Sequence, residues 1–176
     1  MGAGKSTVAR HVAEGHGFLL ADTDDLVVSA CGRSVAQVFA RDGEAAFRRL
    51  ERDAVAAAAC RSGAVIATGG GAVVEEGSRA ILASTGLLVY LEADLDTLLR
   101  RLGDPGVRPL AGAGGASGLA ELFERRRPLY ESLDVRVSTE GRTPQAVADA
   151  VVETFLRCGG LLPLMPRRGS IRDQRR

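Results

Sequence analysis

The chain has 176 residues, of which 45% are hydrophobic and 26% are charged, and its formal net charge is +1. These values are typical of one globular domain and exclude a strongly basic, general nucleic-acid-binding protein. No apolar run reaches about 18 residues, so we expect no membrane span. The widely separated Cys31, Cys60 and Cys158 favour reduced thiols in a cytoplasmic protein.

The first seven residues, MGAGKST, match the end of the phosphate-binding loop G-x-x-x-x-G-K-[ST]. Backbone N–H groups of a glycine-rich turn and the dipole of the following helix both attract phosphate. Lys5, the only lysine of the chain, would reach the phosphates, and Ser6 would be a ligand of Mg²⁺. The candidate nucleotide-binding residues are Gly2, Ala3, Gly4, Lys5, Ser6 and Thr7.

The apolar run GFLLAD at residues 17–22 predicts a buried strand. The sequence DTD, residues 22–24, begins at the last residue of this run. Asp22 and Asp24 would lie at the carboxyl edge of the sheet, where ligands bind in open α/β folds. One carboxylate could hold Mg²⁺ through water while the other accepts a proton from a substrate hydroxyl. The alternative is that an aspartate only caps the next helix, a position that Asp24 also suits.

Apolar residues at helical spacing predict helices over residues 24–32, 33–43 and 44–60. Arg48 lies in the last of these with apolar neighbours, which distinguishes it from the many arginines expected on the surface. A guanidinium group there could bind a substrate carboxylate in bidentate geometry.

Three glycines, Gly69, Gly70 and Gly71, stop the second predicted strand at residues 63–71. Such a run destabilises regular structure and is expected where the backbone must approach a ligand closely. An ordinary loop is the alternative.

The remaining segments continue the alternation of helices and strands. Strands are predicted at 87–93 and 135–139, and helices at 78–86, 94–104, 119–133 and 143–158, whereas residues 105–118 are rich in Gly and Pro and irregular. Because the predicted strands are almost wholly apolar, we expect an α/β domain with a parallel sheet flanked by helices. The domain would span residues 1–158, and residues 159–176 would form a basic, disordered tail.

These segments together resemble the shikimate kinases, small P-loop kinases of the nucleoside-monophosphate-kinase type. The motifs appear in the family order as GAGKST, DTDDLV, GRSVAQVFARDGEAAFRRLE, ATGGGAV, VYLEAD, RPL and RRPLY, from Met1 to about Cys158. The resemblance implies transfer of the γ-phosphoryl group of ATP to the 3-hydroxyl of shikimate, in aromatic amino-acid biosynthesis, with Mg²⁺. It also implies a monomer, whereas the net charge and the lack of a long apolar run are the reasons to expect no nucleic-acid and no membrane partner.

For the nucleotide, the resemblance implies that Lys5 binds the phosphates and that Ser6 and, through water, Asp22 hold Mg²⁺. Arg108 resembles the arginine of a lid that reaches the phosphates, so Lys5 and Arg108 are catalytic candidates. Arg142 resembles the residue that packs on adenine.

For the acceptor, Asp24 resembles the residue that binds the shikimate hydroxyls and acts as the base. Arg48 and Arg126 resemble the clamp on the shikimate carboxylate, Arg126 being chosen because the family pattern reads R-x-P-L-Y. The triple glycine resembles the backbone wall of the substrate pocket.

The resemblance further implies that the strand before the phosphate-binding loop, central in this fold, is missing. Five buried apolar side chains contribute roughly 8–15 kcal/mol, and whole domains are stable by only about 5–15 kcal/mol. We therefore expect that the chain as given is not a stable domain, and that the natural chain starts about ten residues or more upstream of Met1.

Two alternatives remain from the residues alone. One is another small P-loop kinase, for gluconate or a nucleotide, which the choice of acceptor would distinguish. The other is an inactive truncated fragment or a binding module that retains shikimate without phosphorylating it.

Overall fold

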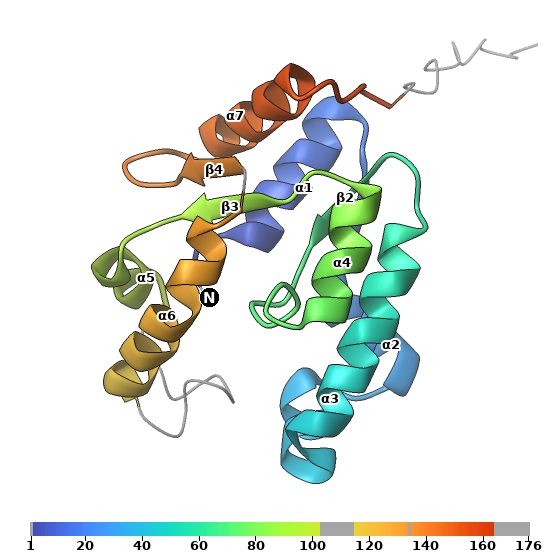
Figure 1. Cartoon of the computed structure of the whole chain (residues 1–176), viewed down its shortest axis with the longest axis vertical. Helices are drawn as coiled ribbons and strands as arrows, with labels where there is room; N and C mark the ends of the chain where they lie inside the picture. Colours follow the sequence, from blue (N-terminus) through green and yellow to red (C-terminus); the bar gives the residue numbers. More distant parts are fainter. Residues whose placement is uncertain (1, 103–114, 134, 164–176) are drawn as a thin grey trace, which may run out of the picture.

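The structure, a computed structural model, describes residues 2–102, 115–133 and 135–163. Helices and strands alternate along these residues, which confirms the predicted α/β class (Figure 1). The elements are α1 (Lys5–His16), β1 (Leu19–Asp22), α2 (Thr23–Cys31), α3 (Val35–Ala59), β2 (Ala64–Ala67), α4 (Glu76–Thr85), β3 (Val89–Glu92), α5 (Leu95–Leu102), α6 (Gly115–Glu131), β4 (Val135–Ser138) and α7 (Pro144–Arg157).

The strands form two parallel pairs. β1 pairs with β2, from Leu19 opposite Ala64 to Asp22 opposite Ala67. β3 pairs with β4, from Val89 opposite Val135 to Glu92 opposite Ser138. Among the described residues no ladder joins β2 to β3, so the sheet consists of two halves.

Both halves lie between the same two layers of helices. On one face, α1 and α7 pack side by side over a cluster that includes Val8, Val137 and Val152 (Figure 1). On the other face, α3 and α4 contribute Val55 and Leu82 to a second cluster. The halves are therefore parts of one layer rather than separate sheets.

Helix α3 contains the break that the sequence predicted. Within Val35–Ala59 the helical backbone is interrupted at Gly43, whose φ of 80° and ψ of 174° are not helical, so the predicted segments 33–43 and 44–60 meet at a kink. Glycine has no Cβ and tolerates this conformation, so the chain changes direction at this residue. Ser34 and Gln37 close the start of α3 with a reciprocal capping box.

The region before α6 departs from the prediction. Residues 115–118, expected in an irregular segment, already belong to α6, which then continues through Pro128 to Glu131. Arg108 and residues 164–176 lie outside the described residues. No helix in the described ranges is both long and apolar enough to cross a membrane.

Candidate active site

The candidate site lies where β1 and β2 end, at the carboxyl edge of one half of the sheet. Asp22 and Ala67 are opposite each other in the ladder, so the residues that follow them are neighbours. The backbone N–H of Gly69 donates a hydrogen bond of 3.0 Å to Oγ1 of Thr23, a side chain with 0% exposure. This buried bond fixes the triple glycine against the start of α2.

The turn before α1 has the geometry of an anion-binding helix start. Gly2 and Gly4 adopt φ values of 75° and 81°, in the left-handed region that glycine favours. No side chain caps α1 and its first turn carries no acidic residue, so its N–H groups and dipole can act on an anion. Ser6 and Thr7 lie in that first turn.

Asp22 connects this turn with α2. Its Oδ2 accepts a hydrogen bond of 2.6 Å from Ser6 Oγ, and its Oδ1 accepts one of 3.0 Å from the backbone N–H of Asp24. The N-cap of α2 is therefore Asp22, and Asp24 lies in the first helical turn. The hypothesis that Asp24 only caps this helix is wrong, because the preceding aspartate holds that position.

The triple glycine leaves room for charged side chains. A Cβ atom on Gly69 would lie 2.5 Å from Oε1 of Glu51 and 3.2 Å from Oδ1 of Asp24. A Cβ atom on Gly71 would overlap the guanidinium group of Arg48. Real Cβ atoms do not approach so closely, so this segment is a wall against which charged groups are packed and not an ordinary loop.

Two arginines reach this wall from different helices. From α3, Arg48 donates hydrogen bonds to Glu51 Oε2 at 2.6 Å and to Glu44 Oε1 at 2.9 Å. From α6, Arg126 donates from Nη1 to the carbonyl oxygen of Gly70 at 3.0 Å, and the hydroxyl of Tyr130 donates to the same oxygen. The structure thus brings Asp24, Arg48 and Arg126 to the same three glycines.

The buried residue Glu51 was not among the sequence candidates. Its side chain is 3% exposed, and burial raises the pKa of its carboxyl group, while Arg48 opposes this effect. Asp24 raises the same pKa further and Arg126 lowers it, so all three charges act on one carboxylate. The sequence signal that could have identified Glu51 is the helical spacing of apolar residues in α3. Glu51 lies on the same helix face as the buried Phe47, Ala54 and Ala58.

The two guanidinium groups respond differently to their surroundings. Burial lowers the pKa of Arg126, and the nearby Arg48 contributes in the same direction. Burial also acts against the charge of Arg48, but its hydrogen bonds to Glu51 and Glu44 outweigh it and raise the pKa of Arg48. Arg126 therefore lies beside a like charge in a partly buried position. An anionic ligand bound there would offset the repulsion between the two guanidinium groups.

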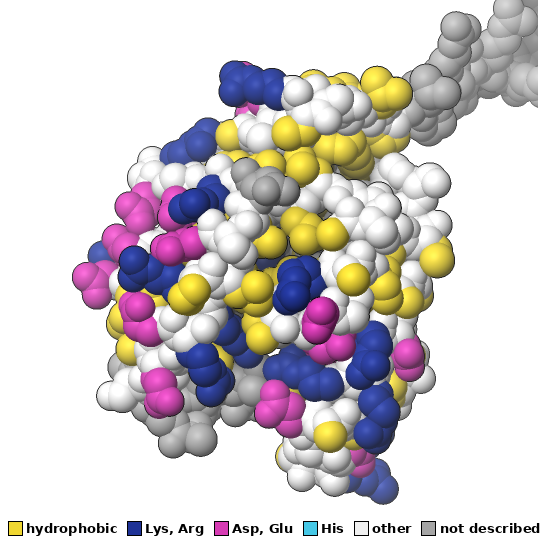
Figure 2. Space-filling model, viewed as in Figure 1, with side chains coloured by type: hydrophobic (Ala, Val, Ile, Leu, Met, Phe, Trp, Pro, Cys, Tyr) yellow, Lys and Arg dark blue, Asp and Glu magenta, His cyan; other side chains and the backbone are white. Residues whose placement is uncertain are grey.

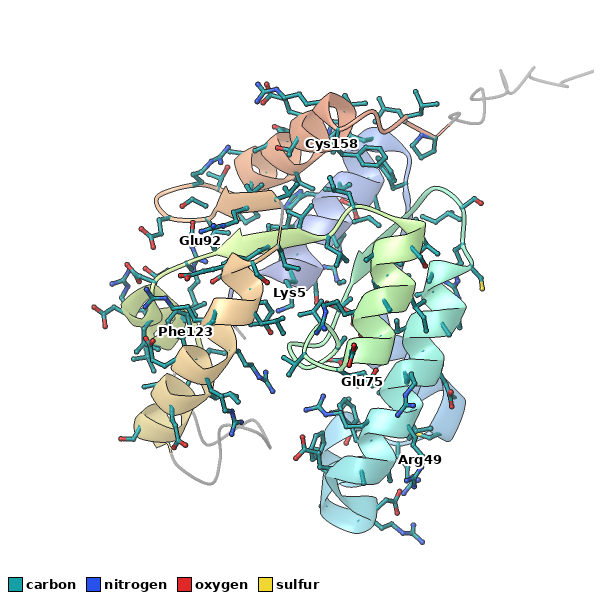
Figure 3. The ribbon with its side chains drawn as sticks, in the orientation of Figure 1. Lys5, Arg49, Glu75, Glu92, Phe123 and Cys158 are labelled. Carbon is teal, nitrogen blue, oxygen red and sulfur yellow. The ribbon has the colours of Figure 1, made fainter. Side chains whose placement is uncertain are left out.

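Lys5 borders the same wall. A small cavity of about 80 Å³ is lined by Lys5, Gly69, Gly70, Phe123 and Tyr130, among others. Figure 3 shows Lys5 near the centre of the view, between α6, which carries Phe123, and α4. On the face drawn in Figure 2, basic side chains gather around the hollow between α6 and α3. Basic side chains, with acidic ones among them, thus border the region between the phosphate-binding turn and the two arginines.

Arg142 lies apart from this cluster. Its Nη2 donates a hydrogen bond of 2.7 Å to the carbonyl oxygen of Ala146, at the start of α7 and beyond the end of β4. Its other contact is with the carbonyl oxygen of Ser138, 3.5 Å away. The described contacts of Arg142 are thus with backbone, and Arg108 is outside the described residues.

The described residues contain no group of three or more His, Cys, Asp or Glu side chains that could hold a metal ion. The hydrogen-bonded Ser6 and Asp22 are nevertheless two oxygen groups at the mouth of the turn. Such a pair suits Mg²⁺, which keeps several waters and takes phosphate oxygens in place of a complete protein cage.

A parallel α/β layer with a glycine-rich turn, one lysine and an Mg²⁺-compatible pair at its carboxyl edge defines a small P-loop kinase. A model of the family described as shikimate kinase matches residues 1–156. The chain belongs to the shikimate kinase family.

Individual relatives agree with this assignment. The chain is 42% identical to a shikimate kinase of Streptomyces coelicolor over 154 residues, which cover 87% of this chain and 90% of that one. It is 43% identical to a shikimate kinase of Gloeobacter violaceus over 160 residues, which cover 90% of this chain and 87% of that one. The fold is similar to that of shikimate kinase from Acinetobacter baumannii in complex with shikimate, with a TM-score of 0.82 and 30% sequence identity. The match covers 90% of this chain and 89% of that one.

Proposed function

We propose that this chain transfers the γ-phosphoryl group of ATP to the 3-hydroxyl of shikimate, forming shikimate 3-phosphate for aromatic amino-acid biosynthesis. Its membership of the shikimate kinase family supports the reaction. The proposal assigns roles to particular residues on one observation: Asp24, Arg48 and Arg126 converge on the triple glycine, beside Lys5.

The acceptor site would bind a small acid that carries hydroxyl groups. Arg48 and Arg126 would hold the carboxylate, since paired guanidinium groups make strong, oriented contacts with it. Asp24 would accept hydrogen bonds from the hydroxyls and take the proton of the attacking oxygen. The glycine wall would let the ring approach the backbone closely, with Glu51 fixing Arg48 from behind.

The nucleotide site would be formed by the turn of residues 2–7. Its N–H groups and Lys5 would hold the phosphates in line with the acceptor hydroxyl. Ser6 and Asp22 would hold Mg²⁺, which neutralises charge on the β- and γ-phosphates. Arg108 would add positive charge from the lid, and Arg142 would pack against adenine.

The reaction requires little covalent chemistry from the protein. Phosphoryl transfer is accelerated mainly by alignment and by neutralising charge on the phosphate oxygens, and the residues of this site supply both. Closure over the acceptor would exclude water and so suppress hydrolysis of ATP. We expect the enzyme to act as a monomer in the cytoplasm, which sedimentation and fractionation would test.

A comparison of acceptors tests the proposal. ADP release from Mg·ATP is measured with shikimate, gluconate and nucleoside monophosphates, alongside the Lys5→Ala variant and circular dichroism of each sample. We expect release that depends on shikimate and is lost in the variant. A folded chain that binds shikimate without phosphorylating it would favour a binding module, and equal release with gluconate would favour the other kinase class.

A further inference from the structure

The carbonyl oxygen of Gly70 joins two side chains of helix α6. It accepts a hydrogen bond of 3.0 Å from Nη1 of Arg126 and another from the hydroxyl of Tyr130. A carbonyl oxygen has two lone pairs, so these two donors fill its capacity to accept hydrogen bonds. The two residues are four positions apart on α6, and side chains at that spacing are neighbours on the helix surface. One face of α6 is therefore attached to the middle glycine of the wall.

The surroundings of the Tyr130 ring determine where its hydroxyl lies. The ring stacks on that of Tyr90 in β3, with centroids 5.2 Å apart and an interplanar angle of 12°. It also packs against the α3–α4 cluster, which contains Val55 and Leu82. A tyrosine side chain has only two torsion angles, so a packed ring leaves its hydroxyl little freedom. The hydrogen bond to Gly70 is thus made by a donor that β3, α3 and α4 hold in place.

The Tyr130 hydroxyl remains a hydrogen-bond donor at neutral pH. Burial raises the pKa of Tyr130, and the neighbouring Arg126 opposes this effect without reversing it. In turn, burial lowers the pKa of Arg126, and Tyr130 acts in the opposite direction. The two groups are therefore close enough to influence each other, in addition to sharing one acceptor.

Arg48 and Arg126, which would hold the carboxylate, are fixed in different ways. Arg48 donates to two glutamate carboxylates, which supply both charge and direction. The hydrogen bond of Arg126 to the described residues runs from Nη1 to a backbone carbonyl, which has no net charge. A long arginine side chain loses considerable rotamer entropy when it is ordered, so one neutral contact orients it weakly. The orientation of Arg126 therefore depends on how firmly the Gly70 carbonyl is held, and Tyr130 is the second side chain that holds it.

We propose that Tyr130 is a positioning residue for recognition of the acceptor carboxylate. Its hydroxyl fixes the Gly70 carbonyl, and this carbonyl orients the guanidinium group of Arg126 beside that of Arg48. Tyr130 acts through Arg126 and contacts neither ATP nor the reacting hydroxyl. Because it concerns the binding of a carboxylate, this role rests on the proposed function.

The substitution Tyr130→Phe tests this role, because it removes the hydroxyl and keeps the stacked ring. The matched control is Tyr90→Phe, which removes the hydroxyl of the other ring in the stack. Calorimetric titration without nucleotide measures the Kd for shikimate, and ADP release measures kcat and KM. We expect Tyr130→Phe to raise Kd and KM for shikimate at least about fivefold, the scale of one neutral hydrogen bond. Both kcat of this variant and Kd of the control should stay within about twofold of the unaltered chain, since neither change affects the reacting atoms.

A double-mutant cycle separates positioning of Arg126 from a general effect on the fold. Tyr130→Phe is also made in the Arg126→Gln background, and circular dichroism establishes that each variant is folded. If Tyr130 acts through Arg126, its substitution in this background should change Kd by less than about twofold, because coupled residues are not additive. The same rise in Kd in both backgrounds would overturn the proposal.

The outcomes distinguish a failure of this role from a failure of the proposed reaction. If the unaltered chain phosphorylates shikimate and Tyr130→Phe binds it equally well, the role of Tyr130 alone is overturned. If the chain binds shikimate without phosphorylating it, the proposed reaction fails and the Kd values still decide the role of Tyr130. A folded chain that does not bind shikimate overturns both. Equal rises in Kd for Tyr130→Phe and Tyr90→Phe, or loss of folding in Tyr130→Phe, would make the hydroxyl structural and overturn its positioning role.

Discussion

At the scale of single residues, the absence of side chains at Gly69 and Gly71 is what allows the charged groups to meet. Arg48 occupies the space where a Cβ atom of Gly71 would lie, and Glu51 and Asp24 border Gly69. The glycines could be recognised as special in the sequence because three in a row follow a strand. Their partners could only in part be predicted, since burial of Glu51 and Thr23 depends on how α2 and α3 pack.

The substitution Gly71→Ala tests the close approach of Arg48. The new Cβ atom would displace the guanidinium group, so we expect the KM for shikimate to rise at least about tenfold, the loss of roughly one charge-assisted contact. The control is Gly86→Ala, since Gly86 is extended and a Cβ atom there would meet nothing within 4 Å. Equal KM values for the two variants would contradict the role of the wall.

The substitution Glu51→Gln tests whether Glu51 positions Arg48. Gln keeps the shape of the carboxyl group but removes a counter-charge of Arg48, so the guanidinium group should lose its fixed orientation. Because burial favours the neutral form at this position and Arg48 keeps Glu44, we expect the free energy of unfolding to change by less than about 1 kcal/mol. The KM for shikimate should rise more than kcat falls. The control is Glu44→Gln, whose side chain is 60% exposed and holds the same arginine. We expect the KM of the control to stay within about twofold of wild type, because an exposed ion pair contributes little; similar increases of KM in both variants would contradict the assignment.

The pH dependence of shikimate binding provides a separate test of Glu51. Burial raises the pKa of Glu51 above 4.5, so its ion pair with Arg48 is lost as pH falls through that higher value. The KM for shikimate should then rise on the acid side at a higher pH than an ordinary glutamate would give. Because the folded state favours the protonated form, this group makes the fold less stable as pH rises above 4.5 through the raised pKa. A KM profile identical in wild type and Glu51→Gln would contradict this account.

At the scale of elements, Asp22 joins three parts of the chain. It ends β1, caps α2 through one carboxylate oxygen and accepts a hydrogen bond from Ser6 of α1 through the other. The sequence indicated an aspartate at the end of a strand, but not which of Asp22 and Asp24 would be the cap. That choice depends on where the helix begins, which is the least predictable property of an element.

Two variants separate the functions of Asp22. Asp22→Ser can still cap α2, so its free energy of unfolding should stay near that of wild type, whereas Asp22→Ala should lose about 1 kcal/mol. Both should lose the Mg²⁺ dependence of activity, since neither retains the carboxylate. Urea unfolding and Mg²⁺ titration of ADP release measure the two effects. Normal Mg²⁺ activation of Asp22→Ser would show that the carboxylate does not serve the metal.

Local sequence patterns predicted the strands correctly. Each predicted strand exists, because runs such as residues 63–68 and 87–92 are apolar on both faces. The break within α3 was predicted at Gly43, because glycine disfavours the interior of a helix, and the backbone is indeed non-helical at this residue. The early start of α6 was missed because residues 115–118 include two glycines and no apolar periodicity.

At the scale of the whole molecule, the arrangement of the layers explains how residues distant in sequence meet at one edge. The two strand pairs are held between α1 and α7 on one face and α3 and α4 on the other. Parallel strands place all their carboxyl ends at the same side, so the residues that follow β1 and β2 meet the phosphate-binding turn there. The α/β class and this edge could be predicted from the alternation of elements. The cavity of about 560 Å³ that residues 63–68 and 87–89 line could be located only in three dimensions.

The most direct test of the central claim is formation of shikimate 3-phosphate, followed by ³¹P NMR, from Mg·ATP and shikimate. The chain is compared with its Lys5→Ala and Asp24→Asn variants. The account predicts a product that requires shikimate, is absent with Lys5→Ala, and forms at least about 100-fold more slowly with Asp24→Asn, the scale expected for loss of a general base. Folded protein that yields no shikimate 3-phosphate, or that yields it equally well without the carboxylate of Asp24, would contradict the account.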